Sequence, residues 1–392
     1  MNQSLAVKKD ADIATDISSD QRVPVLTIER GALLKALAHL QTVVEKRNTI
    51  PILANVKLDA FHGSVALTAT DMEIAVIEQI LADVQEEGSV TIPAHTLYDI
   101  VRKLPDGTQI HISKSTAEEG RLAVQAGHAN FLLPFLPAAE FPIIDQGEMD
   151  HFFTISAAEL AALGNKTRFA VSTDETRYYL NGIYLHAIDN SLAAVSTDGH
   201  RLAKMAVTLP TGAADIPGVI VPRKTVVELV KLIEGSEAPV EVSLSKTKIA
   251  FVCGNAVLIS KLVEGTYPEY QNVIPESSHN VMEIEVQQLI SAVDRISTMS
   301  SEKTRAIRLT VNQNRMELAA ANENSGSGEE VIDVVYSGTP IDCGFNARYI
   351  LEVLATIESK TVQFMFSATG DATVVLDPSV HGALYVIMPM RI

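Results

Sequence analysis

The strongest constraint on the fold of this chain is a pattern that occurs three times along it. A short strand-like run followed by an amphipathic helix is found in three segments: residues 25–44, 152–171 and 281–300. If Ile28, Ile155 and Ile284 are equivalent, the copies are spaced by 127 and 129 residues. Self-similarity at a fixed period predicts copies of one structural module.

The second half of each module also runs from a strand into a helix, and in the first two modules Pro93 and Pro222 close the strand. Ser156, with Glu159 three residues later, predicts a capping box at one helix start. Helical spacing predicts six helices, at residues 31–47, 95–104, 156–169, 223–233, 285–299 and 346–360. The sequence therefore predicts an α+β chain of three tandem modules, each with two helices packed on antiparallel sheets. The expected domains are 23–147, 148–278 and 279–392, after an N-terminal extension, 1–22, whose polar composition predicts disorder.

The charge is unevenly distributed between the helices and the rest of the chain. The net charge is −17, whereas a simple nucleic-acid binder is expected to be basic. The six helix windows together carry +5, which leaves −22 on the remainder. Solvated faces of amphipathic helices explain the bias equally well, but the equivalent placement of helices in three modules favours a basic surface gathered on one side. Most of the helical positive charge comes from Arg47, Arg102, Lys103, Lys166, Arg168, Arg223, Lys224 and Lys231.

Neither a metal site nor a membrane segment is predicted. Cys253 and Cys343 lie in strand-like runs, where a single Cys is usually a small buried hydrophobic residue. No CxxC or Cys/His cluster with metal-ligand spacing occurs, and no apolar run approaches the length of a membrane span. We therefore expect no metal, no cofactor and a cytoplasmic location.

The stretch VSTDGHRLA (195–203) places Ser196, Asp198 and His200 close together in sequence and raises the possibility of a Ser/His hydrolase. A nucleophilic serine needs a base and an oxyanion hole, usually on a strained turn, and no GxSxG motif occurs. Thr70-Asp71 occupies the equivalent point of the first module, which favours a repeated turn closed by the Asp side chain. Gly199 would supply the positive φ of that turn. We expect this cluster to be structural and the protein to be no enzyme.

Several long motifs resemble one family. These are RNTIPILANVKL (47–58), RYYLNGIYL (177–185), STDGHRLA (196–203), VIVPRKTVVELVKLI (219–233), SKLVEGTYPEY (260–270), GFNARYILEVL (344–354) and YVIMPMRI (385–392). They resemble the β subunit of bacterial DNA polymerase III, the sliding clamp family, and the resemblance covers residues 24–392.

The resemblance implies a head-to-tail homodimeric ring of the DNA clamp fold, with helices lining a hole through which duplex DNA passes. The expected function is that of a DNA sliding clamp, a processivity factor in DNA replication. The implied partners are double-stranded DNA, a second copy of the chain, the DNA polymerase III catalytic subunit, the clamp loader, and other polymerases and repair proteins, which bind through a short linear motif. Positions that match residues near DNA are Arg47, Tyr178, Tyr179, Arg223 and Lys224, and strand packing is the alternative role for the two tyrosines.

The family also implies a peptide-binding pocket between the second and third modules. Matching positions are Leu180, Thr197, Gly199, His200, Arg201, Leu202, Pro268, Val273, Asn346, Tyr349, Val386, Ile387, Met388, Pro389, Met390 and Arg391. Their aliphatic and Met side chains predict an adaptable apolar floor, and Arg201 and Arg391 are expected to anchor peptide carbonyls or acidic residues. Asn272 and Thr304 stand where some family members carry Arg and Phe, so we expect an altered motif preference.

The implied dimer interface combines an apolar contact with acidic residues. Matching positions are Phe131, Thr298, Met299, Glu323, Glu329 and Glu330. The opposing side carries His95, Thr96, His128 and Asn130, where family members often have basic residues. Apolar burial is therefore expected to dominate the interface. If His95 and His128 face Glu323, Glu329 or Glu330, protonation of the histidines at low pH would strengthen the pairing.

Overall fold

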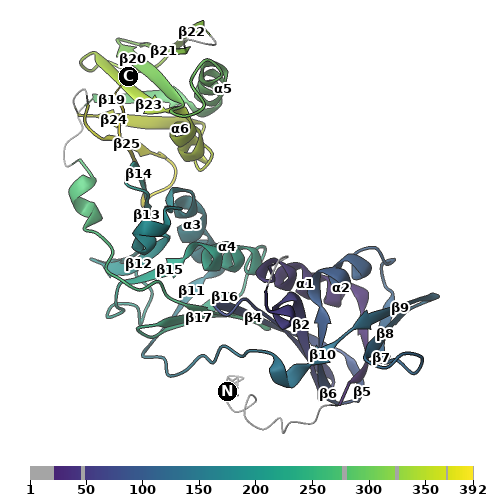
Figure 1. Cartoon of the computed structure of the whole chain (residues 1–392). Coiled ribbons are helices and arrows are strands. Elements are labelled where there is room, and N and C mark those ends of the chain that lie inside the picture. Colours follow the sequence, from purple (N-terminus) through teal and green to yellow (C-terminus); the bar gives the residue numbers. More distant parts are fainter. Residues whose placement is uncertain (1–21, 46–48, 276–279, 323–325, 368–369, 392) are drawn as a thin grey trace. The chain divides into compact units, whose positions relative to one another are not determined.

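The computed structural model of the protein describes residues 22–45, 49–275, 280–322, 326–367 and 370–391, and Figure 1 shows the whole chain. The chain divides into two compact units. Unit 1 contains the residues up to Gly147 and the segment Ala250–Ser260, and unit 2 contains Glu148–Ile249 and Lys261–Ile392. The second and third predicted modules therefore lie together in unit 2, apart from the segment that joins unit 1. Of the predicted extension, only Arg22 is within the described residues.

Unit 1 is built from antiparallel strands and two helices. One sheet has the order β5 (Asp83–Glu86), β1 (Val25–Glu29), β7 (Gln109–Lys114), β8 (Arg121–Ala126) and β9 (Ala129–Pro134). A second run has the order β10 (Leu136–Pro137), β6 (Gly88–Pro93), β2 (Asn55–Phe61), β3 (Ser64–Thr70), β4 (Ile74–Leu81) and β18 (Ala256–Lys261). Helices α1 (Arg30–Val43) and α2 (Ala94–Val101) pack on each other, and α1 also packs on β3 and β4. Among the described residues of this unit there are also two 3₁₀ turns, η2 (Pro51–Ala54) and η3 (Ala138–Glu140).

Unit 2 contains an antiparallel sheet to which the second and third modules each contribute four strands. Its order is β15 (Val219–Pro222), β12 (Gly182–Ile188), β13 (Ser191–Thr197), β14 (Arg201–Thr208), β26 (Ala383–Ile387), β25 (Thr373–Leu376), β24 (Thr361–Phe366) and β19 (Asn280–Glu285). The third module has a further sheet, β22 (Gly326–Asp333), β21 (Arg315–Asn322), β20 (Ala306–Asn312) and β23 (Ile341–Asn346). In addition, β11 (His151–Ser156) pairs with β16 (Pro239–Leu244). Strand β17 (Lys248–Cys253) crosses the division between the units.

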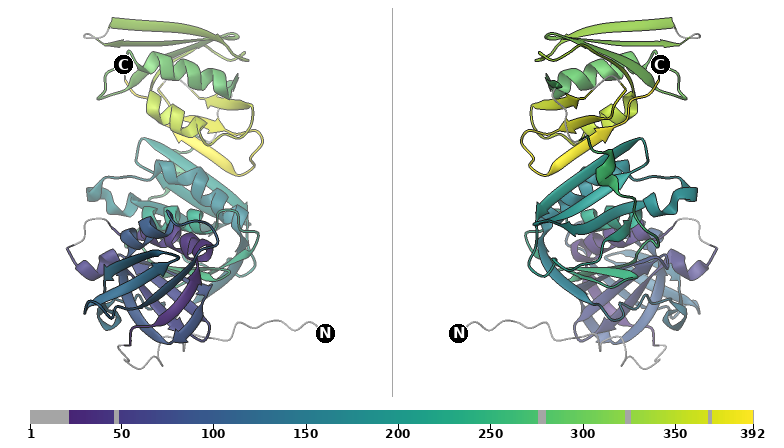
Figure 2. Two further views of the ribbon diagram at one scale, coloured as in Figure 1. Left: turned by 90° about the vertical axis from the view of Figure 1, so that its right-hand side faces the viewer. Right: turned by 90° about the vertical axis from the view of Figure 1, so that its left-hand side faces the viewer.

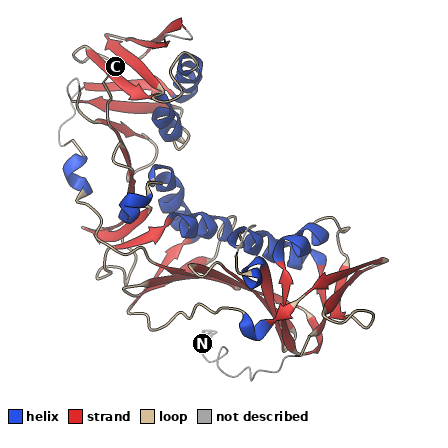
Figure 3. Ribbon diagram, viewed as in Figure 1, coloured by secondary structure: helices blue, strands red, loops and turns tan. Residues whose placement is uncertain are grey.

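Four helices of unit 2 lie on one side of its strands. They are α3 (Ala157–Thr167), α4 (Arg223–Leu232), α5 (Val286–Ser297) and α6 (Ala347–Leu354), accompanied by the 3₁₀ segments η4 (Arg168–Ala170), η5 (Glu175–Leu180) and η6 (Tyr270–Val273). Helix α3 packs against α4, and α5 packs against α6. The two opposite views in Figure 2 show the helices of this unit on one side and its strands on the other. Figure 3, in which helices are blue and strands are red, shows the same separation.

The three-fold pattern in the sequence corresponds to equivalent positions in the structure. Ile28, Ile155 and Ile284 occupy buried positions of β1, β11 and β19, each of which leads directly into a helix. Pro93 and Pro222 end β6 and β15 and stand immediately before α2 and α4. The predicted repeat is thus present as repeated strand–helix units with buried apolar faces.

Local details refine the predicted helix ends. Ser156 caps α3 as predicted, because its Oγ accepts the N–H of Glu159 at 3.2 Å. In a full capping box the Glu159 carboxylate would accept the backbone N–H of Ser156. Here the carboxylate instead accepts the Ser156 hydroxyl, at 2.6 Å. Helix α1 ends at Val43 rather than at residue 47, and α6 ends at Leu354 rather than at residue 360.

No helix among the described residues is both long enough and apolar enough to cross a membrane. Both cysteines, Cys253 and Cys343, are buried and free. Burial raises the pKa of the Cys343 thiol to about 12, so this side chain behaves as a small hydrophobic residue, as the sequence predicts.

Candidate functional site: the joint between the second and third modules

The turn at Asp198 is a hydrogen-bonded structural element. The Asp198 Oδ1 atom accepts the N–H groups of His200 at 2.9 Å and Arg201 at 3.1 Å, and Gly199 has a φ of +89°. The Asp71 Oδ1 atom accepts two N–H groups in the same way, from Glu73 at 2.9 Å and from residue 74 at 2.8 Å. The repeated Thr-Asp pair therefore closes equivalent turns, as predicted. The corresponding loop of the third module, after Asn322, includes residues 323–325, which lie outside the described residues.

The geometry of Ser196 does not support a hydrolase. Ser196 is fully buried, and its Oγ donates a 2.5 Å hydrogen bond to the Thr167 carbonyl. His200 lies at the exposed end of the turn and stacks on Tyr349, with ring centroids 6.4 Å apart. The hydroxyl proton is thus committed to a backbone carbonyl, which leaves no activated nucleophile.

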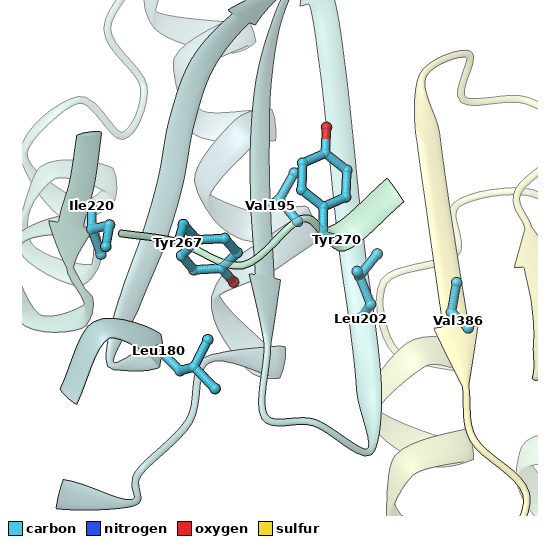
Figure 4. Close-up of a cluster of buried hydrophobic side chains, with 7 residues drawn as sticks. All are labelled: Leu180, Val195, Leu202, Ile220, Tyr267, Tyr270 and Val386. Carbon is cyan, nitrogen blue, oxygen red and sulfur yellow. The ribbon is translucent and has the colours of Figure 1, made fainter. Parts of the chain in front are cut away.

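Three of the predicted pocket residues share one buried apolar cluster. Leu180, Leu202 and Val386 pack together, although they come from η5, β14 and β26, and Figure 4 shows Leu202 and Val386 on these neighbouring strands. The other members of the cluster are Val195, Ile220, Tyr267 and Tyr270. Leu202 and Val386 are paired residues across the β14–β26 ladder, which joins the two modules. The apolar floor is therefore built at this joint.

Several exposed apolar side chains lie close in sequence to members of this buried cluster. Met388 is 41% exposed and immediately follows β26, and Val273 ends η6 with its side chain 49% exposed. Pro268 is also exposed and lies between two tyrosines of the cluster. The chain after β26 is held by two backbone hydrogen bonds, from Met388 N–H to the His200 carbonyl and from Met390 N–H to the Gly344 carbonyl, both 2.9 Å long.

Arg201 differs from the expectation that it anchors a bound peptide. It is only 7% exposed, and its Nε donates to Asp198 at 3.1 Å while another nitrogen donates to the Phe169 carbonyl at 2.7 Å. A third nitrogen is hydrogen-bonded to Glu352. The guanidinium also lies 4.5 Å from the centroid of the Tyr349 ring. Because these groups engage it within the chain, Arg201 fixes the Asp198 turn against α6 instead of reaching out to a ligand.

The other predicted pocket residues divide between two places. Asn346 caps α6, because its side chain accepts the Arg348 N–H at 3.0 Å. Thr197 stabilises the turn by donating to the Arg201 carbonyl at 2.6 Å. The end of the chain instead lines a cavity of about 610 Å³ in the third module, to which Thr304, Pro389, Met390 and Arg391 contribute.

The predicted DNA-facing residues lie on helical segments where the structure describes them. Tyr178 is 55% exposed and meets Tyr179 edge to face, with centroids 5.8 Å apart. Both belong to η5, so the alternative that they pack within a strand is wrong. Arg223 and Lys224 begin α4, and Arg47 lies outside the described residues.

Lys166 is buried and does not belong to the basic helical surface that the sequence predicts. The sequence analysis includes Lys166 among the residues that give the helices their positive charge, but Lys166 is only 6% exposed. Its Nζ lies 2.7 Å from a Glu358 carboxylate oxygen and also donates to the Thr356 carbonyl. Lys166 therefore ties α3 of the second module to the chain after α6 of the third.

The predicted interface residues lie at or beside strands that are sheet edges in the described chain. Phe131 lies on β9, Glu329 and Glu330 lie on β22, and Thr298 and Met299 follow α5. Glu323 is outside the described residues. Glu330 departs from the expected role, because Arg295 of the same chain donates to both of its carboxylate oxygens, at 3.0 and 2.5 Å. This hydrogen bonding holds the pKa of Glu330 below its usual value.

His95 is half-buried and is hydrogen-bonded within its own chain. Its Nε2 donates to the Val44 carbonyl at 3.1 Å. His128 is exposed, as are Thr96 and Asn130. The pairing of the histidines with the glutamates across subunits stays a prediction, although Glu330 already has a cationic partner in its own chain.

Sequence reasoning missed the residues that fasten the second module to the third. Glu352, Thr356 and Glu358 of the third module hold Arg201 or Lys166 of the second, yet Arg201 and Glu352 are 151 positions apart and Lys166 and Thr356 are 190 apart. No local pattern marks such long-range polar contacts.

Comparison with known proteins gives a consistent result over the whole chain. Family models for the DNA polymerase III beta subunit match at residues 25–145 (N-terminal domain), 154–269 (central domain) and 271–391 (C-terminal domain). The beta sliding clamp of Caulobacter vibrioides is 44% identical over 371 residues, which cover 94% of this chain and 100% of that protein. The beta sliding clamp of Escherichia coli K12 is 36% identical over 369 residues, with coverage of 93% and 99%.

Solved structures agree with this assignment. The sliding clamp of Bartonella birtlesii bound to griselimycin superimposes with a TM-score of 0.90 at 42% identity, covering 94% of this chain and 100% of that one. The Caulobacter crescentus clamp with bound PEG gives a TM-score of 0.89 at 44% identity, covering 95% and 100%. The chain therefore belongs to the DNA polymerase III beta subunit family and is a DNA sliding clamp, a processivity factor of DNA replication and not an enzyme.

Proposed function

We propose that two copies of this chain close head to tail into a ring around duplex DNA and tether replication and repair proteins to it. The observation that carries this proposal is the joint between the second and third modules. There the exposed Met388 and Val273 come shortly after Val386 and Tyr270, two residues of the buried apolar cluster. The chain that carries this surface belongs to the sliding clamp family. Such a surface suits a short peptide with large apolar side chains.

Two strand edges support ring closure. In the part of the chain that the structure describes, β9 and β22 each lie at the edge of a sheet. An edge strand offers unpaired N–H and C=O groups that another chain can pair with. Because the two edges are different surfaces, pairing β9 of one copy with β22 of another is a heterologous contact, and two such contacts close a dimeric ring.

Apolar contact is proposed to dominate that interface. Phe131 is partly exposed on β9. Met299 packs over β22, where a Cβ added to Gly328 would lie 3.1 Å from its Cγ. Glu329 and Thr298 are exposed beside them. Since Arg295 already neutralises Glu330, ion pairs contribute less than the apolar contact.

DNA is proposed to be held by topology and by loose contacts to phosphate. Phosphate contacts carry no sequence information, which suits a protein that slides along any sequence. Arg47, Tyr178, Tyr179, Arg223 and Lys224 are the proposed contact residues. With Lys166 removed from the helical positive charge, the basic lining is weaker than the sequence alone suggested, which favours sliding over tight binding.

The proposed partners at the peptide pocket are the DNA polymerase III catalytic subunit, the clamp loader, and other polymerases and repair proteins that carry the same short motif. Direct contact is proposed for His200, Tyr349 and the tail from Met388 to Arg391. Leu180, Leu202, Val386 and Ile387 are buried and are proposed to form the apolar floor of this surface. Arg201, Thr197 and Asn346 are proposed to position this surface. We further propose module boundaries at 147/148 and 278/279 and a cytoplasmic location.

The molar mass in solution tests ring closure. Light scattering at micromolar concentration should give twice the chain mass of 42.3 kDa. A species of one chain mass under these conditions would contradict the dimeric ring.

A further inference from the structure

Two tyrosines anchor the segment that carries part of the pocket rim. Residues 267–273, here called the rim segment, include Tyr267, Pro268, Tyr270 and Val273. The two tyrosines are 7% and 3% exposed and belong to the buried apolar cluster, whereas Pro268 and Val273 are exposed. In Figure 4 both tyrosine rings lie against strands β13 and β14. The position of the rim therefore depends on the contacts that hold these two rings.

The two rings belong to a stack of four aromatic side chains. Tyr184 and His186 are two positions apart on β12, so both project from the same face of the sheet. Tyr267 stacks on Tyr184, with ring centroids 4.9 Å apart and planes 2° from parallel. Tyr184 stacks in turn on His186, with centroids 4.5 Å apart. The His186 ring also meets Tyr270, and its Nε2 atom lies 3.1 Å from the Tyr270 hydroxyl oxygen. His186 thus links both tyrosines of the rim segment to β12.

The hydrogen bonds of His186 define the tautomer of its neutral ring. The Nδ1 atom lies 3.3 Å from the Ala187 carbonyl oxygen, which can only accept a hydrogen bond. Nδ1 therefore carries the proton, and Nε2 accepts the hydrogen bond that the Tyr270 hydroxyl donates. A second proton, on Nε2, would turn this acceptor into a donor. The buried Tyr270 hydroxyl would then lose the acceptor for its own proton, which is unfavourable.

The surroundings of His186 disfavour its charged form. The side chain is only 7% exposed, and this burial lowers the pKa of His186 below its ordinary value of 6.5. The hydrogen bond to the Ala187 carbonyl acts in the opposite direction, but burial outweighs it. Lys204 on β14 further lowers this pKa, because its positive charge repels a protonated ring. The neutral ring is therefore present above pH 6.5 and is lost as the pH falls below that value.

Other charged groups near the stack do not reverse this preference. Strands β13 and β15, which pair with β12 on either side, carry no ionisable side chain. Asp189 follows β12, and its negative charge acts with burial to raise the pKa of Tyr270 to about 12, so this hydroxyl keeps its proton. Glu269 on the rim segment is exposed and accepts a hydrogen bond from the Asn272 side chain at 3.2 Å. Among the described residues no carboxylate is hydrogen-bonded to the His186 ring.

We propose that His186 is a positioning residue of the peptide pocket, and that protonation of its ring loosens the rim segment and weakens peptide binding. This role rests on the proposed function, since it concerns the same pocket. Neutral His186 accepts the Tyr270 hydroxyl and thereby fixes the segment that presents Pro268 and Val273. Because a peptide favours the fixed rim and a proton favours the loosened one, the two compete. By reciprocity, a bound peptide makes His186 harder to protonate.

Three variants of the full-length protein test this role. His186→Gln retains a side-chain acceptor for the Tyr270 hydroxyl but has no ring to protonate. Tyr270→Phe retains the aromatic ring and removes the hydroxyl. His381→Gln is the matched control, because His381 is an exposed histidine of the same unit outside the stack. Circular dichroism and melting temperatures at pH 7.5 and 5.5 establish that each variant is folded, and Tyr270→Phe carries the test if His186→Gln unfolds.

Fluorescence anisotropy gives the Kd of a labelled peptide that carries the clamp-binding motif of the replicative polymerase. Between pH 7.5 and 5.5, the wild type and His381→Gln should lose about threefold to tenfold more affinity than His186→Gln and Tyr270→Phe, the effect of one hydrogen bond. Tyr270→Phe should bind more weakly by a similar factor already at pH 7.5, because its hydrogen bond is absent. His200 is present at the pocket in all four proteins, so its own protonation cancels in the comparison.

Nuclear magnetic resonance of histidine labelled with ¹³C at Cε1 gives a second readout. The signal of His186 is the one that is absent from the spectrum of His186→Gln. The midpoint of its titration should move to lower pH when the peptide is bound. A histidine that only stabilises the fold would keep the same midpoint with and without peptide.

Parallel losses of affinity with pH in the wild type and His186→Gln, or a midpoint that peptide does not move, would overturn the role of His186. Failure of the wild type to bind the peptide at pH 7.5 would instead contradict the proposed pocket, and with it this role. Because the first result requires peptide binding at pH 7.5 and the second is its absence, the two failures are distinguishable.

Discussion

Removing the last five residues, Met388 to Ile392, should abolish peptide binding while leaving the fold intact. The sheet ends at Ile387, so the deletion removes no strand. It removes two backbone hydrogen bonds, made by Met388 and Met390. At about 0.5–1.5 kcal/mol each, their loss lowers the free energy of unfolding by about 1–3 kcal/mol.

The effect on a bound peptide is expected to be larger. Burying a Met side chain contributes about 1.5–3 kcal/mol, so the loss of two such contacts costs about 3–6 kcal/mol. Because each 1.4 kcal/mol is tenfold in affinity, a Kd near 1 μM should weaken by roughly 100-fold to 10,000-fold.

Fluorescence anisotropy with a labelled peptide that carries the clamp-binding motif of the replicative polymerase measures this change. Met388→Leu is the matched control, because it conserves volume and the backbone hydrogen bond and should change affinity by less than threefold. Light scattering should show that the truncated protein remains dimeric. If the truncated protein binds the peptide within threefold of the full-length protein, the tail is not part of the pocket.

Three further results are expected. Phe131→Ala should cost on the order of 3–5 kcal/mol of association if the ring is buried between subunits, so light scattering should show monomers at micromolar concentration; a dimeric variant would refute this assignment. Ser196→Ala should lower the free energy of unfolding in urea by about 1–3 kcal/mol, because the Thr167 carbonyl loses its donor, whereas peptide affinity should stay unchanged; a loss of affinity would contradict a purely structural role. Burial would raise the pKa of Asp377, but hydrogen bonds from the N–H and hydroxyl groups around it outweigh burial and lower this pKa from 3.8 to about 2. The depressed pKa gives a stabilisation that is present above pH 4 and is lost as the pH falls to 2, so the stability difference between wild type and Asp377→Asn should shrink by about 2 kcal/mol over that range.

Local patterns predicted the elements of this fold well because those elements are fixed by nearby residues. The turn at Asp198 follows from a side chain that bonds N–H groups two and three positions later, and the start of α3 follows from the Ser156 cap. Residues of this kind carry their structural reason within a few positions of sequence. Such features can be predicted without knowledge of the tertiary structure.

The end of α6 shows why other features could not be predicted. Helical spacing continues to residue 360, but the chain leaves the helix after Leu354. The segment that follows is bound by distant groups, since Asp377 accepts the Glu358 N–H at 2.7 Å and Lys166 pairs with the Glu358 side chain. Tertiary contacts thus override local helix propensity.

Arg201 illustrates the same limit at the functional site. The family resemblance placed Arg201 at the peptide pocket and implied that its side chain anchors a bound peptide. Whether an arginine reaches toward a ligand or inward depends on which acceptors the fold brings to it. Here Glu352 and the Phe169 carbonyl come from other parts of the chain and hold it within the protein.

Retention on closed and open DNA tests the central claim most directly. The protein is loaded onto a nicked circular plasmid with a clamp loader and ATP, half of the sample is linearised with a restriction enzyme, and both halves are passed through a gel-filtration column. A ring that holds DNA by topology should stay with the circular plasmid and be lost from the linear one, whose ends are free. Equal retention on both forms, or no retention on the circle, would contradict the conclusion that this chain encircles DNA.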